Sequence, residues 1–212
     1  ASPYIARQFV KSPSFMDIIP ISGTSVNRLV PHSLGTDVGL VLLTSTTNTS
    51  SWAVWHRSMA ATDFAVLNTS AATGTDATYW NSTAPTSTDI SIGTNSNVNL
   101  SGRDYIIYAF AHSPDDGIFC GEYTGTAAIS NKIVTGFRVD DVMIKSESTG
   151  HWNIFNRNLT ADTLLEADTS SSESAAVSFI SFDEDGFTIN TTDAEVNAAA
   201  TDYIFKAIKV GV

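Results

Sequence analysis

Two stretches of eight residues, one hundred positions apart, follow the same order of residue types. They are residues 52–59 (Trp-Ala-Val-Trp-His-Arg-Ser-Met) and residues 152–159 (Trp-Asn-Ile-Phe-Asn-Arg-Asn-Leu). Each contains Trp, a variable residue, a β-branched residue, an aromatic residue, a polar residue, Arg, a polar residue and a large apolar residue. Successive side chains of a strand point to opposite faces, so in the first block Trp52 and Val54 would lie on one face and Ala53, Trp55 and Arg57 on the other. Any fold of this chain must therefore contain two similar strands, one in each half of the sequence.

Further matches follow in the same order at offsets close to one hundred. They pair residues 40–43 with 142–144, 68–70 with 168–170, Tyr79 with Phe179, 90–92 with 187–189, Val98-Asn99 with Val196-Asn197, and 104–109 with 202–207. A chain rich in Ser and Thr could give one such match by chance, but hardly six in register. The sequence therefore predicts an internal duplication.

The pattern along the chain predicts an all-β fold. Ser, Thr, Asn, Ala and Gly are abundant while Lys, Arg and Glu are scarce, which disfavours long surface helices. The clearest strand signals are residues 40–43, 64–67, 79–80, 90–92 and 105–111, and the run at 105–111 is apolar enough for a central strand. Residues 161–167 and 193–200 are each predicted to form a single helical turn. We expect a β-sandwich, jelly-roll-like or concanavalin-like, built from two internal repeats.

The repeats divide the chain into three parts. We expect an N-terminal arm at residues 1–8, a first β repeat at 9–113 and a second at 114–212, with both repeats packed as one unit. The turn that begins with Ser113-Pro114 marks the division. The pattern leaves open whether the halves form one sandwich or two sandwiches face to face.

Composition limits the partners. The net charge is −11, and such a chain repels nucleic acid and anionic lipid, so neither is expected as a partner. Cys120 is the single cysteine, which excludes an intramolecular disulfide and favours a small buried side chain.

The repeated aromatic and charged residues are interpreted as structural anchors. Large aromatics that alternate on strands mostly belong to cores, which favours this reading for Trp52 and Trp152. Arg57 and Arg157 also repeat, in a chain with few basic residues. We expect each Arg to pair with a repeated carboxylate, namely Asp104 and Asp202 respectively, and so to hold a strand end in register.

One tryptophan lacks an aromatic counterpart. Trp80 is matched by Ile180 and is followed by a polar loop at residues 81–88. An exposed aromatic beside hydroxyls and amides could stack on a sugar ring. Trp80, Asn81 and Thr83 are therefore the candidate contact for a receptor or a host-surface glycan.

The sequence contains no recognisable catalytic or zinc motif. The four His residues are scattered without metal-binding spacing, and neither a nucleophile elbow nor a phosphate-binding loop occurs. Asp115/Asp116 and Asp183/Asp185 lie beside Gly, where calcium is an alternative to simple hairpin turns. We expect no enzyme activity, no cofactor and no bound metal.

Several blocks resemble bacteriophage structural proteins, especially tail-fibre-like proteins of marine phages and cyanophages. The resemblance is carried by residues 29–35, 39–43, 52–59, 67–71, 81–88 and 98–102, and in the second half by 136–137, 142–145 and 152–157. It covers nearly the whole chain after about residue 9. It implies a virion component on a tail or on the particle surface, and it supplies no catalytic residues. Because no fibre shaft precedes the repeats, capsid decoration or a short appendage is an equal expectation.

The leading hypothesis is therefore an oligomeric virion structural protein, whose expected partners are other virion proteins and further copies of the chain. Contact with a host receptor is an open alternative within this hypothesis. A carbohydrate-binding module of concanavalin-like fold is the second hypothesis, and a glycan-degrading enzyme with two carboxylates in a cleft is the third.

Overall fold

The computed structural model describes residues 8–157, 163–171, 174–175 and 178–209. The predicted arm at residues 1–8 lies outside this range except for Gln8, which is exposed. The described chain is all-β, with antiparallel sheets and three α-helices of four residues each. None of the described helices has the length and hydropathy that a membrane span requires.

The first half of the chain forms one large sheet and one small sheet. The large sheet has the order β1-β8-β3-β4-β5-β6, and the small sheet pairs β2 with β7. The elements are β1 (Met16–Ser22), β2 (Arg28–Pro31), β3 (Val38–Ser45), β4 (Ala53–His56), β5 (Asp63–Val66), β6 (Gly74–Thr75), α1 (Ala77–Trp80), β7 (Asp89–Ile92), α2 (Ser96–Asn99) and β8 (Asp104–Ala111).

The second half has a large sheet with the corresponding chain order. This sheet runs β9-β17-β11-β12-β13-β14, and a three-stranded sheet runs β10-β16-β15. The elements are η1 (Pro114–Asp116), β9 (Ile118–Thr124), β10 (Asn131–Val134), β11 (Asp141–Ser146), β12 (Trp152–Asn156), β13 (Thr163–Glu166), β14 (Ser174–Ala175), β15 (Ile180–Phe182), β16 (Gly186–Ile189), α3 (Ala194–Asn197) and β17 (Asp202–Ile208).

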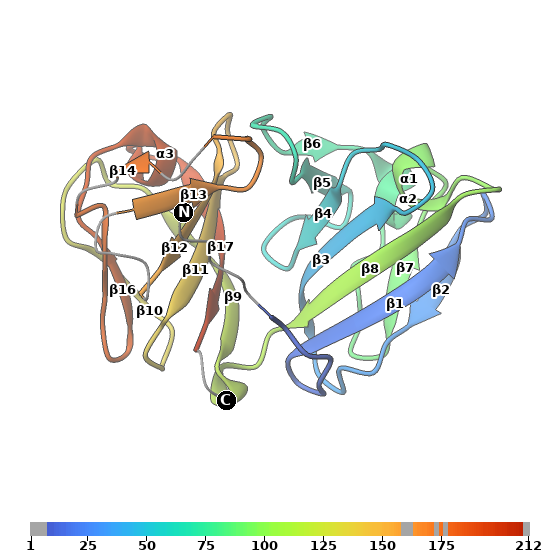
Figure 1. Cartoon of the computed structure of the whole chain (residues 1–212), viewed down its shortest axis with the longest axis horizontal. Coiled ribbons are helices and arrows are strands. Elements are labelled where there is room, and N and C mark those ends of the chain that lie inside the picture. The colour runs from blue at the N-terminus through green and yellow to red at the C-terminus, as the bar shows by residue number, and fades with distance from the viewer. Residues whose placement is uncertain (1–7, 158–162, 172–173, 176–177, 210–212) are drawn as a thin grey trace, which may run out of the picture.

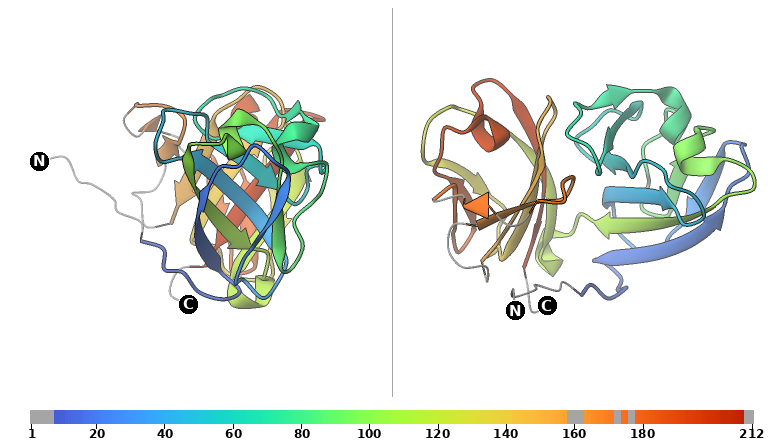
Figure 2. Two further views of the ribbon diagram at one scale, coloured as in Figure 1. Left: turned by 90° about the vertical axis from the view of Figure 1, so that its right-hand side faces the viewer. Right: turned by 45° about the horizontal axis from the view of Figure 1, so that its top comes forward.

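The two large sheets face each other, and the small sheets lie on the outer sides of the molecule (Figures 1 and 2). In each half the small sheet packs on the large one: Ile90 and Ile107 belong to one apolar cluster, and Phe187 and Phe205 belong to another. The first cluster continues across the boundary between the halves to Trp152. We call this boundary, where the two large sheets meet, the seam.

The alternation of side chains along the central strands explains this arrangement. In β17, Tyr203 and Phe205 point into the core of the second half, whereas Ile204 belongs to the cluster that includes the seam. Both faces of the strand are therefore covered. The same holds for β8, which lies between β1 and β3, so the expectation of a central strand at residues 105–111 is confirmed.

A buried asparagine holds a loop in each half. Asn99 accepts a hydrogen bond from the Thr24 backbone N–H at 2.9 Å, and its amide donates to the carbonyls of Val26 and Gly93, both at 2.8 Å. Asn99 and Asn197 are both fully buried. Buried backbone groups need partners, so each asparagine supplies bonds that a strand ladder does not.

Asn197 repeats this pattern in the second half. It accepts from the Thr126 N–H at 2.9 Å and donates to the carbonyls of Ala128 and Thr191 at 2.8 and 2.6 Å. The two loops are therefore held by the same chemistry at corresponding places.

A buried tyrosine closes the short helix in each half. The Tyr105 hydroxyl donates to the Ser96 carbonyl at 2.8 Å and accepts from the Leu100 N–H at 2.9 Å. The Tyr203 hydroxyl makes the corresponding bonds to Ala194 and Ala198, at 2.7 and 2.8 Å. A buried phenol with both bonds made stabilises the end of a four-residue helix that would not persist alone.

Two local predictions are wrong and one is confirmed. Residues 79–80 end helix α1 and do not form a strand, because Asp76 caps the turn by accepting from the Thr78 N–H at 2.8 Å. Residues 163–166 form strand β13 where a helical turn was expected, because they pair with β12 and β14. The turn expected within 193–200 is confirmed as α3, which is capped by Asp193.

Candidate functional site

The predicted contact at Trp80 is wrong, because Trp80 is fully buried. Helix α1 turns both aromatic side chains inward, and Tyr79 stacks on Phe64 with ring centroids 4.0 Å apart. A strand would instead have placed neighbouring side chains on opposite faces. The loop that follows α1 is exposed at Asn81 and Thr83, as expected for a contact loop, but no exposed Trp80 side chain lies beside it.

The predicted ion pairs of the repeated arginines are also wrong. Arg157 pairs with Asp140 at 3.0 Å and donates to the Val139 carbonyl, and it does not bond to Asp202. Arg57 is exposed, and its backbone N–H donates to the Gly39 carbonyl at 3.0 Å. The guanidinium groups therefore differ between the halves.

The repeated carboxylates have a different partner. Asp104 accepts a hydrogen bond from the Ser22 hydroxyl at 2.8 Å, and Asp202 accepts one from the Thr124 hydroxyl at 2.7 Å. Each bond joins the end of one central strand to its neighbour in the sheet. The predicted role at a strand end fits these contacts, but a hydroxyl takes the place of the arginine.

The acidic turns use their carboxylates locally. Asp116 accepts from the Ser113 hydroxyl at 2.6 Å within η1, and Asp183 accepts from the Thr188 hydroxyl at 2.6 Å. Asp185 pairs with Lys132 at 2.9 Å, although both side chains are about half exposed. Among the residues that the structure describes, no group of three or more His, Cys, Asp or Glu side chains is placed to hold a metal ion.

The two anchor tryptophans share a backbone contact. The Trp52 N–H donates to the Asn68 side chain at 2.9 Å, and the Trp152 N–H donates to the Asp168 side chain at 3.0 Å. The side chains differ, however: the expectation of a core position is confirmed for Trp152 and is wrong for Trp52. Trp152 is fully buried, whereas Trp52 is partly exposed and stacks in parallel on Tyr108 with centroids 6.2 Å apart.

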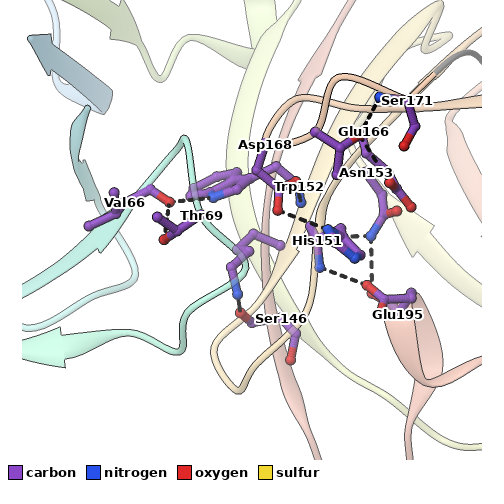
Figure 3. Close-up of polar contacts among 12 residues, drawn as sticks. Val66, Thr69, Ser146, His151, Trp152, Asn153, Glu166, Asp168, Ser171 and Glu195 are labelled. Carbon is purple, nitrogen blue, oxygen red and sulfur yellow. Dashed lines mark hydrogen bonds and ion pairs between the residues drawn. The ribbon is translucent and has the colours of Figure 1, made fainter. Parts of the chain in front are cut away.

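The Trp152 indole crosses the seam. Its Nε1–H donates to the Val66 carbonyl in β5 at 2.9 Å (Figure 3). Next to it, the Thr73 N–H donates to the Glu147 carbonyl, and the Gly150 N–H donates to the Ser70 carbonyl, each at 2.9 Å. The hairpin loop between β11 and β12 is thus attached to the first half.

Beside this indole lies a charged cluster that has no counterpart in the first half (Figure 3). His151 Nδ1 lies 2.8 Å from Asp168, and the His151 backbone N–H donates to Glu195 at 2.7 Å. The hydrogen bond that His151 donates to the Asp168 carboxylate raises the pKa of His151 above its usual value. At the corresponding positions the first half has Ser51 and Asn68, which are both neutral.

A buried lysine completes the same region. Lys145 is fully buried, and its ammonium donates to the carbonyls of Ser146 and Ser148, the latter at 2.8 Å. Burial lowers the pKa of Lys145 to about 8, while the nearby carboxylates, Glu195 first, oppose the shift. The ammonium folds back on its own hairpin loop and holds that loop against the seam.

His56 lies at the other end of the seam contacts. It is buried, and its Nε2 lies 3.1 Å from the Phe205 carbonyl of the second half. The Ser58 N–H donates to Nδ1 at 3.2 Å, so the ring is neutral and carries its proton on Nε2. Burial lowers the pKa of His56 to about 4. His112 also accepts a backbone N–H at Nδ1, from Cys120, and burial lowers its pKa.

The middle of the seam is tightly packed. A Cβ on Gly39 would lie 2.6 Å from the Cys120 sulfur and 2.8 Å from the Ala111 carbonyl oxygen, so this glycine allows β9 to approach β3. Cys120 is buried as expected, and burial raises the pKa of its thiol to about 12. The ammonium of Lys206 lies 4.0 Å from the centroid of the Phe110 ring, a cation–π contact between the halves.

An open groove lies on the first half, at the hairpin between β3 and β4. It is lined by residues 44–50, Trp52 and Asn68, and its volume is about 470 Å³. The lining contains Thr, Ser and Asn, one indole and no charged side chain. In the second half the corresponding hairpin carries Glu147 and is attached to the seam. Residues 44–50 carry no signal of a site in the sequence, because Ser, Thr and Asn are equally common in ordinary turns.

Residues 9–209 match the model of a protein family described as a domain of unknown function, DUF7483. The chain belongs to this family. No curated protein matches the chain, and no solved structure matches it.

The family match spans both halves of the chain and ends close to the last described residue. The seam and the open groove therefore both lie inside the DUF7483 domain. The domain therefore consists of both halves together.

Proposed function

We propose that this DUF7483 domain is a structural component of a bacteriophage particle, on a tail appendage or on the capsid surface. The resemblance of residues 29–59 and 136–157 to tail-fibre-like phage proteins supports this proposal. The proposal includes the finer reading of the fold: two copies of one β-sandwich unit, jelly-roll-like or concanavalin-like, fused head to tail. The shared strand order of the two large sheets and the repeated Asn99 and Asn197 bonds support the duplication.

The single observation that carries the proposal is the seam. The apolar cluster of the first half runs across it to Trp152, and side-chain bonds from His56 and Trp152 join backbone carbonyls of the opposite half. Apolar packing and hydrogen bonds therefore both join the two halves. In each large sheet the central strand, β8 or β17, pairs on both sides with strands far away in the chain. Such non-local pairing is associated with slow folding and, at equal stability, with slow unfolding. A particle component needs such kinetic stability, because it must survive outside the cell.

The test is the composition of purified particles. We expect mass spectrometry of density-purified phage particles to detect the chain in several copies per particle, since such components follow the symmetry of the particle. Separated tails and capsids then decide between the two locations. If the chain is found in infected cells but is absent from purified particles, the structural role is excluded.

A carbohydrate-binding module is the second candidate, and the open groove beside Trp52 favours it. This alternative predicts a free, soluble protein that binds a defined sugar outside any particle. Sedimentation of an infected-cell lysate separates the two candidates: the module stays in the soluble fraction, whereas the particle component sediments with the phage.

A further inference from the structure

The groove between residues 44–50, Trp52 and Asn68 differs from its counterpart in the second half in three ways: the exposure of the indole, the charge of the hairpin and the attachment of the hairpin to the other half. We propose that this groove binds a neutral glycan, with Trp52 as the platform for one sugar ring. The proposal goes beyond the structural role above and does not depend on it, since a soluble module could carry the same groove.

The first argument is the partly exposed indole. Trp52 lines the groove and stacks on Tyr108, with an interplanar angle of 5°. The stack fixes the plane of the indole before any ligand arrives, which reduces the entropy lost on binding. The face of an aromatic ring is electron-rich, so it attracts the weakly positive C–H groups on one face of a pyranose.

The second argument is the order within the loop. The Ser45 hydroxyl donates to the Asp104 carbonyl at 3.1 Å and accepts the backbone N–H groups of Thr47 and Asn48, at 3.3 and 3.2 Å. The Thr46 N–H donates to the same Asp104 carbonyl at 2.9 Å. These bonds hold the backbone of the loop in one shape, as a specific binding site requires.

The third argument is the set of polar groups left for a ligand. The side chains of Thr46, Asn48 and Thr49 are exposed and make no hydrogen bond within the described part of the chain. Asn68 uses its carbonyl oxygen for the Trp52 N–H, and its amide N–H groups have no acceptor among the described residues. Together they offer donors and acceptors of the kind that sugar hydroxyls match.

The fourth argument is charge. No ionisable side chain lines the groove, and the chain as a whole carries a net charge of −11. An anionic sugar would meet repulsion from the whole molecule without a cation in the groove to compensate for it. The groove therefore favours uncharged sugars over sialylated or sulfated ones.

The second half shows what fills such a place when it is not a binding site. There the indole of Trp152 is buried with its N–H bonded to Val66, and the Lys145 ammonium holds the carbonyls of the hairpin loop. The Glu147 and Gly150 backbone groups bond to the first half. The loop of the second half is used for the seam, while the loop of the first half is left open.

The experiment is a binding assay with the full chain. The probes are neutral oligosaccharides of glucose, galactose, mannose and N-acetylglucosamine, beside sialylated and sulfated ones, first on an array and then by calorimetry. We expect at least one neutral oligosaccharide to bind and its acidic derivatives to bind less well. Trp52→Ala should lower the affinity about tenfold or more, as for a central aromatic contact.

Two further sets of variants keep the result interpretable. Asn48→Ala combined with Thr49→Val changes exposed side chains only, so it should weaken binding while the unfolding curve stays that of the wild type. Asn81→Gly combined with Thr83→Val in the 81–88 loop is the control, since Gly tolerates the positive φ of 52° at residue 81, and it should leave the affinity unchanged. The proposal is overturned if no neutral oligosaccharide binds the wild type, or if the loop variant loses binding while the groove variant keeps it.

Discussion

The two halves of the molecule have the same sheet order but use their corresponding residues differently. The buried Asn99 and Asn197 make nearly the same bonds, and so do Tyr105 and Tyr203. By contrast, Trp52 borders an open groove, whereas its counterpart Trp152 is locked into the seam. Residues with the same contacts in both halves hold the fold, and residues whose contacts differ form the seam and the groove.

The largest expected effect comes from the repeated asparagines. Asn99→Ala and Asn197→Ala each leave several buried backbone groups without a partner, at about 1–3 kcal/mol for each group. We expect each variant to lower the free energy of unfolding by about 3–5 kcal/mol, measured by urea denaturation. Similar losses in both halves are the critical result. If one variant loses less than about 1 kcal/mol, the two bonding patterns are not equivalent.

The next effect separates the two anchor tryptophans. Trp152→Phe removes the bond to the Val66 carbonyl and leaves a small cavity in a fully buried site. We expect a loss of about 2–3 kcal/mol for Trp152→Phe, and of less than about 1 kcal/mol for Trp52→Phe, which keeps a ring on Tyr108. Equal losses in urea denaturation would mean that the two side chains have equivalent environments.

The third expectation concerns pH. His56 has a folded-state pKa of about 4, below the usual value of 6.5, so the unfolded chain binds more protons between these values. Above about pH 6.5 His56 is neutral in both the folded and the unfolded chain, so it does not reduce the free energy of unfolding. As the pH decreases from 6.5 toward 4, the unfolded chain takes up a proton that the folded chain does not, and the free energy of unfolding falls. The expected loss is about 3 kcal/mol at most.

The variant His56→Gln tests this assignment, because its amide N–H can still donate to Phe205 but does not titrate. We expect its free energy of unfolding to depend less on pH between 4 and 6.5 than that of the wild type. His32→Gln, in the first half and away from the seam, is the control. A wild-type pH dependence in His56→Gln would assign the effect to other groups.

The smallest expected effect is that of Asp168→Asn, which gives the second half the residue found at position 68. The variant keeps an acceptor for the Trp152 N–H and loses the ion pair with His151. Because Asp168 raises the pKa of His151, the pair stabilises the fold below the usual pKa, and this contribution is lost as the pH rises through the folded value.

We expect the Asp168→Asn variant to bring the pKa of His151 back toward its usual value, measured by NMR titration of the ring. The loss of stability should be less than about 1 kcal/mol at pH 5 and smaller at pH 8, since the His151 side chain is 34% exposed. An unchanged titration would show that Asp168 does not control this histidine.

Much of the fold could be predicted from the sequence because the matching blocks in the two halves coincide with strands. The apolar run of β8 and the blocks at residues 40–43 and 142–144 are strands, and the echo Val98-Asn99 with Val196-Asn197 marks the two buried asparagines. Periodicity could not distinguish a strand from a helical turn at residues 79–80, since two residues carry no period. Because residues 79–80 were assigned to a strand, Trp80 was predicted at the surface, whereas it lies in the core.

The seam and the groove could not be predicted in the same way. Lys206 in an apolar strand and the change from Asn68 to Asp168 beside His151 are signals in the sequence, but only the packing of the two large sheets gives them a role. The residues of the groove are Ser, Thr and Asn, which are equally common in ordinary turns. Its significance comes from the partly exposed Trp52, and exposure is a property of the folded chain.

The most direct test of the account is an amide chemical-shift map of the full chain titrated with the neutral oligosaccharide that binds best. The account predicts that the largest shifts fall on residues 44–50 and on Asn68, and that the corresponding hairpin at residues 146–151 stays unchanged. Shifts at 146–151 of similar size, or shifts confined to the 81–88 loop, would contradict it.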